Sequence, residues 1–315
     1  MSADLGALGP IGLGTASLAR VTSDPGDFAD VVDEAVSAGV RYVDTAPMYE
    51  CGEAERLIGQ ALGRLNDRPV LSTKVGRLVR PLGADEDPSA VPPEHFTRGG
   101  WRTVFDFSAT GVRASLRESL ERLRTDRVDI VYVHDPEAEW DVVMCETIPA
   151  ALALKEAGQV RAIGIGTNRV DRLEAAVREY PLDQVLIAGR YTLLDQSAES
   201  VMETCLERGT RVVIGGVFNS GILASPSTGS FDYRSAESDV RSRAALLAEV
   251  CVRHGADLMA AAIRFPLRHP AVAAVLLGPE NLAQLRSTLT AARAEIPGEL
   301  WHDLAAAGVR VAPSP

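Results

Sequence analysis

The chain has 315 residues, of which 46% are hydrophobic and 24% charged, the balance of a soluble globular protein with a large core. Its net charge of −11 argues against nucleic acid or an anionic membrane as a partner. The N-terminus has no signal-peptide pattern and no apolar run approaches the ~20 residues of a membrane span, which predicts a cytoplasmic protein.

Strands and helices are predicted to alternate along the chain. The strand candidates are short and continuously apolar, as expected for strands buried on both faces. They are residues 11–15, the run ending at Asp44, the run ending at Lys74, and residues 128–133, 160–166, 184–188, 211–215 and 273–277. Helix-period apolar positions fall between them. They cover residues 28–36, 53–65, 108–123, 148–157, 171–180, 199–208, 240–254, 258–267 and, as the last helix, 281–292.

Two long connections interrupt this alternation. Residues 76–106 contain Pro81, Pro88, Pro92 and Pro93, several glycines and an acidic run at 85–87, which predicts a long loop. We interpret it as a lid in which Trp101, Phe105 and Phe107 are available to cover a substrate. A surface insertion is an equally good interpretation of its first half. The second connection, residues 217–237, is rich in glycine and serine.

Eight strands interleaved with helices, without a dividing linker, predict an α/β fold: a (β/α)₈ TIM barrel forming a single domain over residues 1–315, with long loops after strands 3 and 7. A doubly wound open sheet also alternates strand and helix. It is expected to carry G-x-G-x-x-G in its first turn, and Gly12-Leu13-Gly14 is followed by no third glycine. The sequence therefore favours the barrel.

Three of the predicted strands each deliver ionisable residues at or just beyond their carboxyl ends. Asp44 and Tyr49 follow the second strand, Lys74 ends the third and His134 ends the fourth. In a parallel barrel these ends share one face, so the four side chains are expected to lie together. A nearby ammonium lowers the pKa of a tyrosine, which predicts a proton-transfer site centred on Tyr49.

The set Asp44, Tyr49, Lys74 and His134 resembles the catalytic tetrad of the aldo-keto reductases in order and spacing. Residues 11–15 and the stretch from 106 to 135 are similar to the branch containing D-threo-aldose and L-fucose dehydrogenases. The resemblance implies an NAD(P)-dependent oxidoreductase that interconverts a sugar lactol and its lactone, or an alcohol and a carbonyl, with Tyr49 as base or acid. A reductase of a non-sugar aldehyde such as pyridoxal, and a cofactor-binding regulatory barrel, are the alternatives.

The same resemblance implies the cofactor contacts. They are Gly14 and Thr15, then Thr167 and Asn168, then Gly216, Phe218 and Ser220, and finally Gly278, Glu280 and Asn281. The chain departs from the family at Ala188, where Gln is usual, and at Gly215, where an aromatic ring usually stacks on the nicotinamide; Phe218 or Tyr191 is a possible substitute.

Glu280 stands where NADP-dependent relatives usually carry a cation. A carboxylate there repels a 2′-phosphate and accepts from a ribose hydroxyl, which favours NAD over NADP. Asn281 also fits a plain helix N-cap, and Arg286 is an alternative partner for a phosphate.

The predicted partner is a small-molecule carbonyl or sugar substrate, with Trp101, Asp135 and Arg190 as candidate contacts. No second histidine accompanies His134, so no metal site is predicted. The four cysteines (Cys51, Cys145, Cys205, Cys251) lack metal-ligand spacing and are expected to be free thiols, although Cys51 follows Tyr49 closely enough to be considered reactive. The sequence makes no prediction of the oligomeric state.

Overall fold

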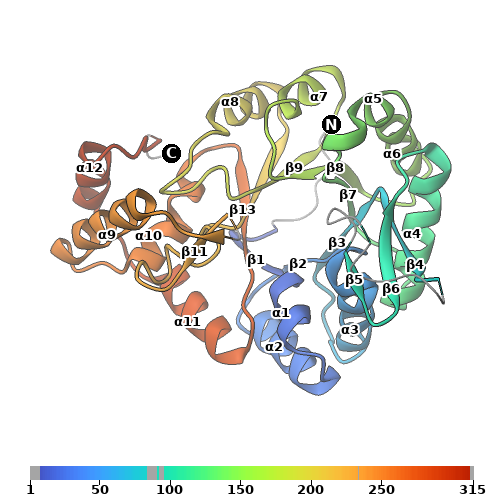
Figure 1. Ribbon diagram of the computed structural model, residues 1–315, viewed down its shortest axis with the longest axis horizontal. Helices are drawn as coiled ribbons and strands as arrows, with labels where there is room; N and C mark the ends of the chain where they lie inside the picture. Colours follow the sequence, from blue (N-terminus) through green and yellow to red (C-terminus); the bar gives the residue numbers. More distant parts are fainter. Residues whose placement is uncertain (1–7, 84–90, 92–95, 233, 313–315) are drawn as a thin grey trace.

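The computed structural model describes residues 8–83, 91, 96–232 and 234–312 and contains a closed barrel of parallel strands (Figure 1). The strands follow the order β1-β2-β3-β7-β8-β9-β10-β13, which closes on β1. Their bounds are β1 Ile11–Gly14, β2 Tyr42–Asp44, β3 Val70–Val75, β7 Ile130–His134, β8 Ala162–Thr167, β9 Gln184–Ala188, β10 Arg211–Gly215 and β13 Val272–Leu277. The predicted (β/α)₈ barrel and its eight strands are confirmed.

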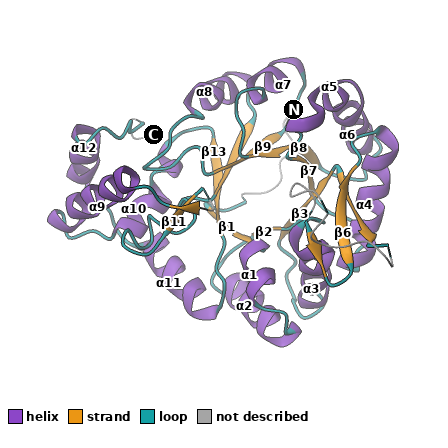
Figure 2. Cartoon of the chain, in the orientation of Figure 1, coloured by secondary structure: helices purple, strands orange, loops and turns teal. Residues whose placement is uncertain are grey.

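Helices cover the outside of the barrel (Figure 2). Those that follow the strands in turn are α2 (Pro25–Ser37), α3 (Glu53–Leu62), α4 (Ala109–Leu123), α6 (Ile148–Glu156), α7 (Leu173–Glu179), α8 (Glu199–Arg208), α9 (Ser238–Arg253), α10 (Leu258–Arg264) and α11 (Leu282–Arg293). Each of them has buried apolar residues, as α2 has at Phe28, Val31, Val32 and Ala35.

The inside of the barrel has its own packed core. Tyr42, Ile130, Tyr132, Leu186 and Leu276 form part of one buried cluster there. Strands β8 and β9 approach closely at Gly164, where an added Cβ would lie 2.0 Å from the carbonyl oxygen of Gln184. Side chains therefore fill the barrel, which leaves the strand ends as the place for a site.

The first long connection is not a loop without regular structure, and that prediction is wrong. It contains β4 (Arg77–Pro81), β5 (Thr97–Arg98) and β6 (Trp101–Phe105), paired as an antiparallel sheet in the order β4-β6-β5. Pro81 ends β4 and pairs with Trp101 of β6, and Gly99 and Gly100 form the turn between β5 and β6. Pro88, Pro92, Pro93 and the acidic run at 85–87 lie outside the described residues.

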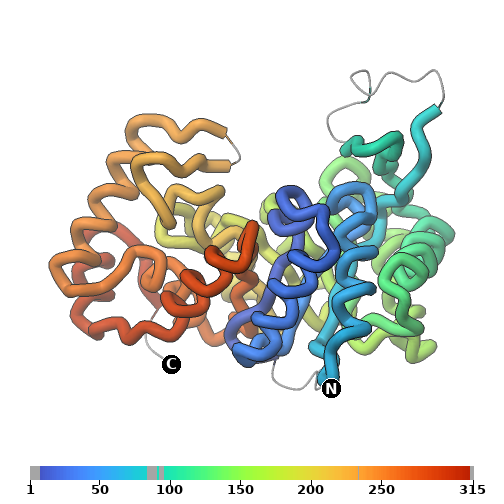
Figure 3. Tube along the Cα trace, turned by 90° about the horizontal axis from the view of Figure 1, so that it is seen from below, coloured from blue at the N-terminus to red at the C-terminus, as the bar shows by residue number. Residues whose placement is uncertain are grey.

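The second long connection also contains paired strands, β11 (Ser230–Phe231) and β12 (Arg234–Ser235). Both insertions rise from the same end of the barrel (Figure 3). They flank the carboxyl ends of the parallel strands.

Short helices escaped prediction. They are α1 (Ala16–Val21), α5 (Trp140–Val142) and α12 (Gly298–Ala306), so residues 281–292 are not the last helix. The α12 helix buries Leu300, Trp301 and Leu304, an apolar face too short to stand out in the sequence. Over the described part of the chain, no helix combines the length and the apolar character needed to cross a membrane.

Candidate active site

The centre of the site is a buried ion pair between neighbouring strands. Lys74 Nζ lies 2.6 Å from Asp44 Oδ2 and 2.9 Å from the carbonyl oxygen of Thr45, to which it donates. Both charged side chains are at most 3% exposed. Parallel pairing of β2 with β3 sets this contact, because it places Asp44 beside Ser72, two residues before Lys74.

The other two residues of the set complete the cluster. Tyr49 lies in a turn of 3₁₀ helix after β2, and Lys74 Nζ is 4.6 Å from the centroid of its ring. The His134 ring, at the end of β7, meets the Tyr49 ring edge-on with centroids 5.9 Å apart. The structure thus brings all four predicted residues together at the carboxyl ends of the strands.

The pKa of Tyr49 is set by opposing effects. Burial is the largest and raises the pKa to about 12; the charge of Lys74 lowers it and that of Asp44 raises it. Lys74 acts in the direction expected from the sequence, but burial outweighs it. Tyr49 is therefore a protonated phenol at neutral pH, and any change in Lys74 should move its pKa.

His134 is held neutral. Burial first, then the charges of Lys74 and Arg77, lower its pKa well below the usual value. Its Nε2 lies 3.5 Å from Asp135 Oδ2, and its buried Nδ1 has no hydrogen-bond partner among the described residues. A neutral imidazole can donate one N–H to a substrate oxygen without adding charge to the site.

Sequence reasoning missed a buried polar chain beneath the tetrad. Ser72 Oγ donates to Asp44 Oδ1 at 2.6 Å, and the Tyr42 hydroxyl lies 2.9 Å from Ser72 Oγ. The Tyr132 hydroxyl is 3.2 Å from that of Tyr42 and donates to Gln184 Oε1 at 2.9 Å. These residues had a signal: Tyr42, Ser72 and Tyr132 each lie two positions before a tetrad residue, hence on the same face of their strands.

The turn that carries Tyr49 is anchored from the antiparallel sheet. Glu50 and Cys51 have left-handed backbone conformations, with φ of 54° and 52°. Arg98 of β5 forms an ion pair with the buried Glu50 carboxylate, and Cys51 Sγ donates to the Phe96 carbonyl oxygen at 3.5 Å. Such strained residues persist where surrounding contacts fix them.

All four cysteines lie in the described part of the chain and are free thiols. Burial raises the pKa of Cys51 to about 11, so its thiol stays protonated and unreactive at neutral pH.

Two of the residues predicted to contact the cofactor, Gly14 and Thr15, adjoin the tetrad. Gly14 pairs in register with Asp44, and buried Thr15 donates its hydroxyl to the Asp44 carbonyl oxygen at 3.0 Å. The turn after β10 has left-handed residues at Gly216 (φ 64°) and Ser220 (φ 60°). Turns of this kind expose backbone N–H groups and fit an anionic pyrophosphate.

Phe218 and Tyr191 are the two candidates for the aromatic ring that is missing at Gly215. Tyr191 is buried, and its ring centroid lies 5.2 Å from that of Phe265 and 5.7 Å from that of His269. These core contacts favour Phe218 over Tyr191 as the substitute. Phe218 is only partly buried and remains the candidate.

The loop after β13 carries paired charges. Glu280 Oε1 accepts from Arg20 Nη2 of α1 at 2.9 Å, and Arg286 Nε donates to Glu34 Oε1 of α2 at 3.0 Å. Gly278 precedes this turn, and Asn281 caps α11 by accepting from the backbone N–H of Gln284 at 3.0 Å. Glu280 and Arg286 each have an oppositely charged partner, and the partner of Glu280, Arg20, was not predicted from the sequence.

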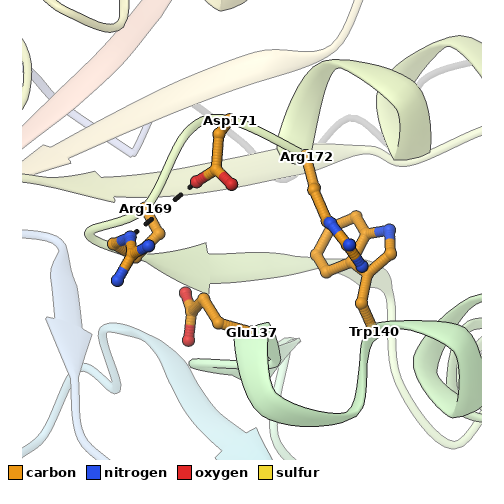
Figure 4. A pocket seen from close by; sticks show the side chains of 5 residues that line it. All are labelled: Glu137, Trp140, Arg169, Asp171 and Arg172. Atoms are coloured by element: carbon orange, nitrogen blue, oxygen red, sulfur yellow. Dashed lines mark ion pairs between the residues drawn. The ribbon is translucent and has the colours of Figure 1, made fainter.

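Thr167 ends β8 and Asn168 follows it, just before a pocket of about 220 Å³ lined by Glu137, Trp140, Arg169, Asp171 and Arg172. Glu137, Arg169 and Asp171 lie on one side of it and Trp140 and Arg172 on the other (Figure 4). The pocket contains none of the tetrad residues. One of its lining residues, Glu137, accepts a hydrogen bond from the Thr167 hydroxyl.

The three substrate candidates have different surroundings. Trp101 lies on β6 and is 48% exposed. Arg190 is used up by structural contacts: Nε donates to the Asn168 carbonyl oxygen, Nη1 to Asp195 and Nη2 to Asp232, at 2.8 to 2.9 Å. These hydrogen bonds join Arg190 to the segments that contain Asn168, Asp195 and Asp232. Of the three candidates, Asp135 is the one that lies beside a tetrad residue, His134.

Fold and site together define a (β/α)₈ oxidoreductase, with a Tyr–Lys–Asp–His cluster at the carboxyl ends of the strands. The aldo/keto reductase family model matches residues 10–308, and the chain belongs to this family of NAD(P)-dependent oxidoreductases. Membership favours an enzyme over a regulatory barrel. Over the described residues no group of three or more His, Cys, Asp or Glu side chains is arranged to hold a metal ion.

Two curated relatives match almost the whole chain. The D-threo-aldose 1-dehydrogenase of Pseudomonas sp is 40% identical, covering 98% of this chain and 96% of the relative. The pyridoxal 4-dehydrogenase of Microbacterium luteolum is 37% identical over 95% and 94%. Among solved structures, an aldo-keto reductase from Bacillus halodurans (holo form) superposes with a TM-score of 0.76 at 24% identity, covering 96% and 93%, which supports the fold alone.

Proposed function

We propose that this enzyme oxidises the lactol form of an aldose to its lactone, or catalyses the reverse carbonyl reduction, as an aldose 1-dehydrogenase. The observation that carries the proposal is the contact of Lys74 Nζ with Asp44 Oδ2 at 2.6 Å beneath the Tyr49 ring. The relative at 40% identity is a D-threo-aldose 1-dehydrogenase. We take residues 1–315 as one catalytic domain.

Each tetrad residue has a role in moving one proton. On oxidation the phenolate form of Tyr49 takes the proton of the substrate hydroxyl, and on reduction the phenol form donates a proton to the reacting oxygen. Lys74 lowers the pKa of Tyr49 and Asp44 holds the ammonium in place. Neutral His134 orients the reacting oxygen by donating an N–H. A bound nicotinamide supplies the hydride chemistry, since none of these side chains can do so.

We propose NAD as the preferred cofactor. Glu280 and Arg20 form one neutral pair and Arg286 and Glu34 another, so these four residues offer no net positive charge to a 2′-phosphate. The α11 N-terminus attracts anions in general, but the Glu280 carboxylate opposes a phosphate and can accept from a ribose hydroxyl. The other proposed contacts are Gly14, Thr15, Thr167, Asn168, Gly216, Phe218, Ser220, Gly278 and Asn281.

A second candidate is the oxidation or reduction of a non-sugar aldehyde, favoured by the 37% identical pyridoxal 4-dehydrogenase. A steady-state assay of NAD(P)H absorbance over a panel of aldoses, pyridoxal and simple aldehydes separates the two. Aldose oxidation with NAD supports the first proposal. Turnover of pyridoxal or simple aldehydes without any aldose activity contradicts it.

A further inference from the structure

An ion pair outside the tetrad joins the antiparallel sheet to the active site. Arg77, the first residue of β4, donates from Nη2 to Asp135 Oδ2 at 3.2 Å. The Arg77 side chain is 7% exposed, whereas that of Asp135 is 30% exposed. The carboxylate is thus the accessible partner, and the guanidinium lies behind it.

Arg77 is held firmly enough to position this carboxylate. Its guanidinium carbon lies 4.3 Å from the centroid of the Phe105 ring on β6, a cation–π contact. Its carbonyl oxygen accepts from Ser115 Oγ of α4 at 3.2 Å. The preceding Gly76 has φ of 98°, and a Cβ there would lie 2.2 Å from the Phe107 ring. The Phe105 ring, helix α4 and the turn at Gly76 therefore fix the position of Arg77.

Asp135 is placed by an unusual backbone. It follows His134 directly, has φ of 45°, and its N–H donates to the Gly166 carbonyl oxygen at 2.9 Å. This turns its carboxylate back toward the site, with Oδ2 at 3.5 Å from His134 Nε2. The neighbouring carboxylate of Glu137 is occupied by the Thr167 hydroxyl. Asp135 is therefore an acceptor beside the group that orients the reacting oxygen.

We propose that Asp135 accepts a hydrogen bond from the substrate hydroxyl on the carbon next to the reacting carbon, and that Arg77 is the residue that positions it. The inference rests on the proposed function and deepens it by naming the recognised group. An ionised carboxylate only accepts hydrogen bonds, so it selects substrates with a hydroxyl donor at this place. Polyhydroxylated substrates are preferred over those that lack the adjacent hydroxyl.

The test compares kcat/KM for an aldose and its 2-deoxy counterpart in wild type, Asp135→Asn, Arg77→Gln and Arg80→Gln. The loss of a hydrogen bond to a charged group predicts a fall of about 10- to 100-fold for the aldose in Asp135→Asn. The kcat/KM for the 2-deoxyaldose should fall less than about 3-fold in Asp135→Asn, because this substrate has no hydroxyl to donate at that carbon. Arg77→Gln should act in the same direction.

Arg80→Gln is the matched control, because Arg80 lies on the same strand and pairs with Glu118 at 2.9 Å. It should leave both kcat/KM values unchanged. If kcat/KM falls equally for the two substrates in Asp135→Asn, or does not fall for either, the assignment of Asp135 is wrong while the proposed function stands. If the wild-type enzyme oxidises a non-sugar alcohol but no aldose, the proposed function is wrong, and this inference is wrong with it.

Discussion

The Ser72 hydroxyl donates to Asp44 Oδ1 at 2.6 Å, on the opposite carboxylate oxygen from Lys74. Asp44 is therefore held at both oxygens inside the barrel, and its orientation does not depend on solvent. This contact links the core of the barrel to the proton-transfer site.

Ser72→Ala should damage both stability and turnover. It leaves the buried Asp44 Oδ1 without this donor, at an expected cost of about 1–3 kcal/mol in the free energy of unfolding. A freer Asp44 positions Lys74 less well, so kcat should also fall. Denaturant unfolding and steady-state kinetics measure the two effects. Tyr132→Phe, which removes a hydroxyl two contacts further away, should affect kcat less; the opposite order would contradict this account.

Lys74→Met should shift the pH profile of oxidation. Burial already raises the pKa of Tyr49 to about 12, and Lys74 opposes that rise. Deleting the ammonium therefore raises the pKa further, so the alkaline rise in kcat should move to higher pH as the rate at neutral pH falls. A lower rate with an unmoved profile would mean that Lys74 serves only as a structural partner of Asp44.

The titration of Asp135 should give the pH profile of kcat/KM a separate acidic limb. Burial raises its pKa to about 6, Arg77 lowers it, Glu137 raises it and Lys74 lowers it; neutral His134 adds no charge. As the pH falls through that value the carboxylate is protonated and loses an acceptor. The kcat/KM for an aldose should then fall below about pH 6 in wild type, and this limb should be absent in Asp135→Asn. An identical limb in both proteins would assign it to another group.

Arg98→Ala should loosen the Tyr49 turn. It leaves the Glu50 carboxylate, 8% exposed, without its ion-pair partner and removes a restraint on a left-handed segment. Because Arg98 is itself 36% exposed, we expect a moderate cost of about 1–2 kcal/mol and a reduced kcat. Arg56→Ala breaks the more exposed pair with Glu53 and is the control. Equal effects in thermal unfolding would show that Glu50 needs no partner.

Glu280→Arg should change cofactor preference. It replaces the carboxylate paired with Arg20 by a second cation at the start of α11. The ratio of cofactor dissociation constants, measured by fluorescence titration, should shift toward NADP. Glu299→Arg makes the same charge change on exposed α12 and should leave the ratio alone. If wild type already prefers NADP and Glu280→Arg leaves the ratio unchanged, another cation binds the phosphate.

The barrel and the tetrad were predictable because both depend on local patterns. Continuous apolar runs mark buried strands, and the ionisable residue at each end falls on one face by topology. The sheet β4-β6-β5 was not predictable, because the prolines and glycines of this segment obscure the alternation of apolar and polar residues that marks a strand. Arg190 looked available in the sequence, yet its partner Asp232 lies 42 residues away. Such pairings arise only from tertiary structure.

Tyr49→Phe tests the central claim most directly. Phenylalanine fills the same space and removes only the hydroxyl that transfers the proton. Turnover should fall at least ~10²-fold, the scale of general acid–base catalysis, while the dissociation constant for the nicotinamide cofactor stays at the wild-type value. Near-wild-type turnover in Tyr49→Phe would contradict the account and place the proton transfer on another residue.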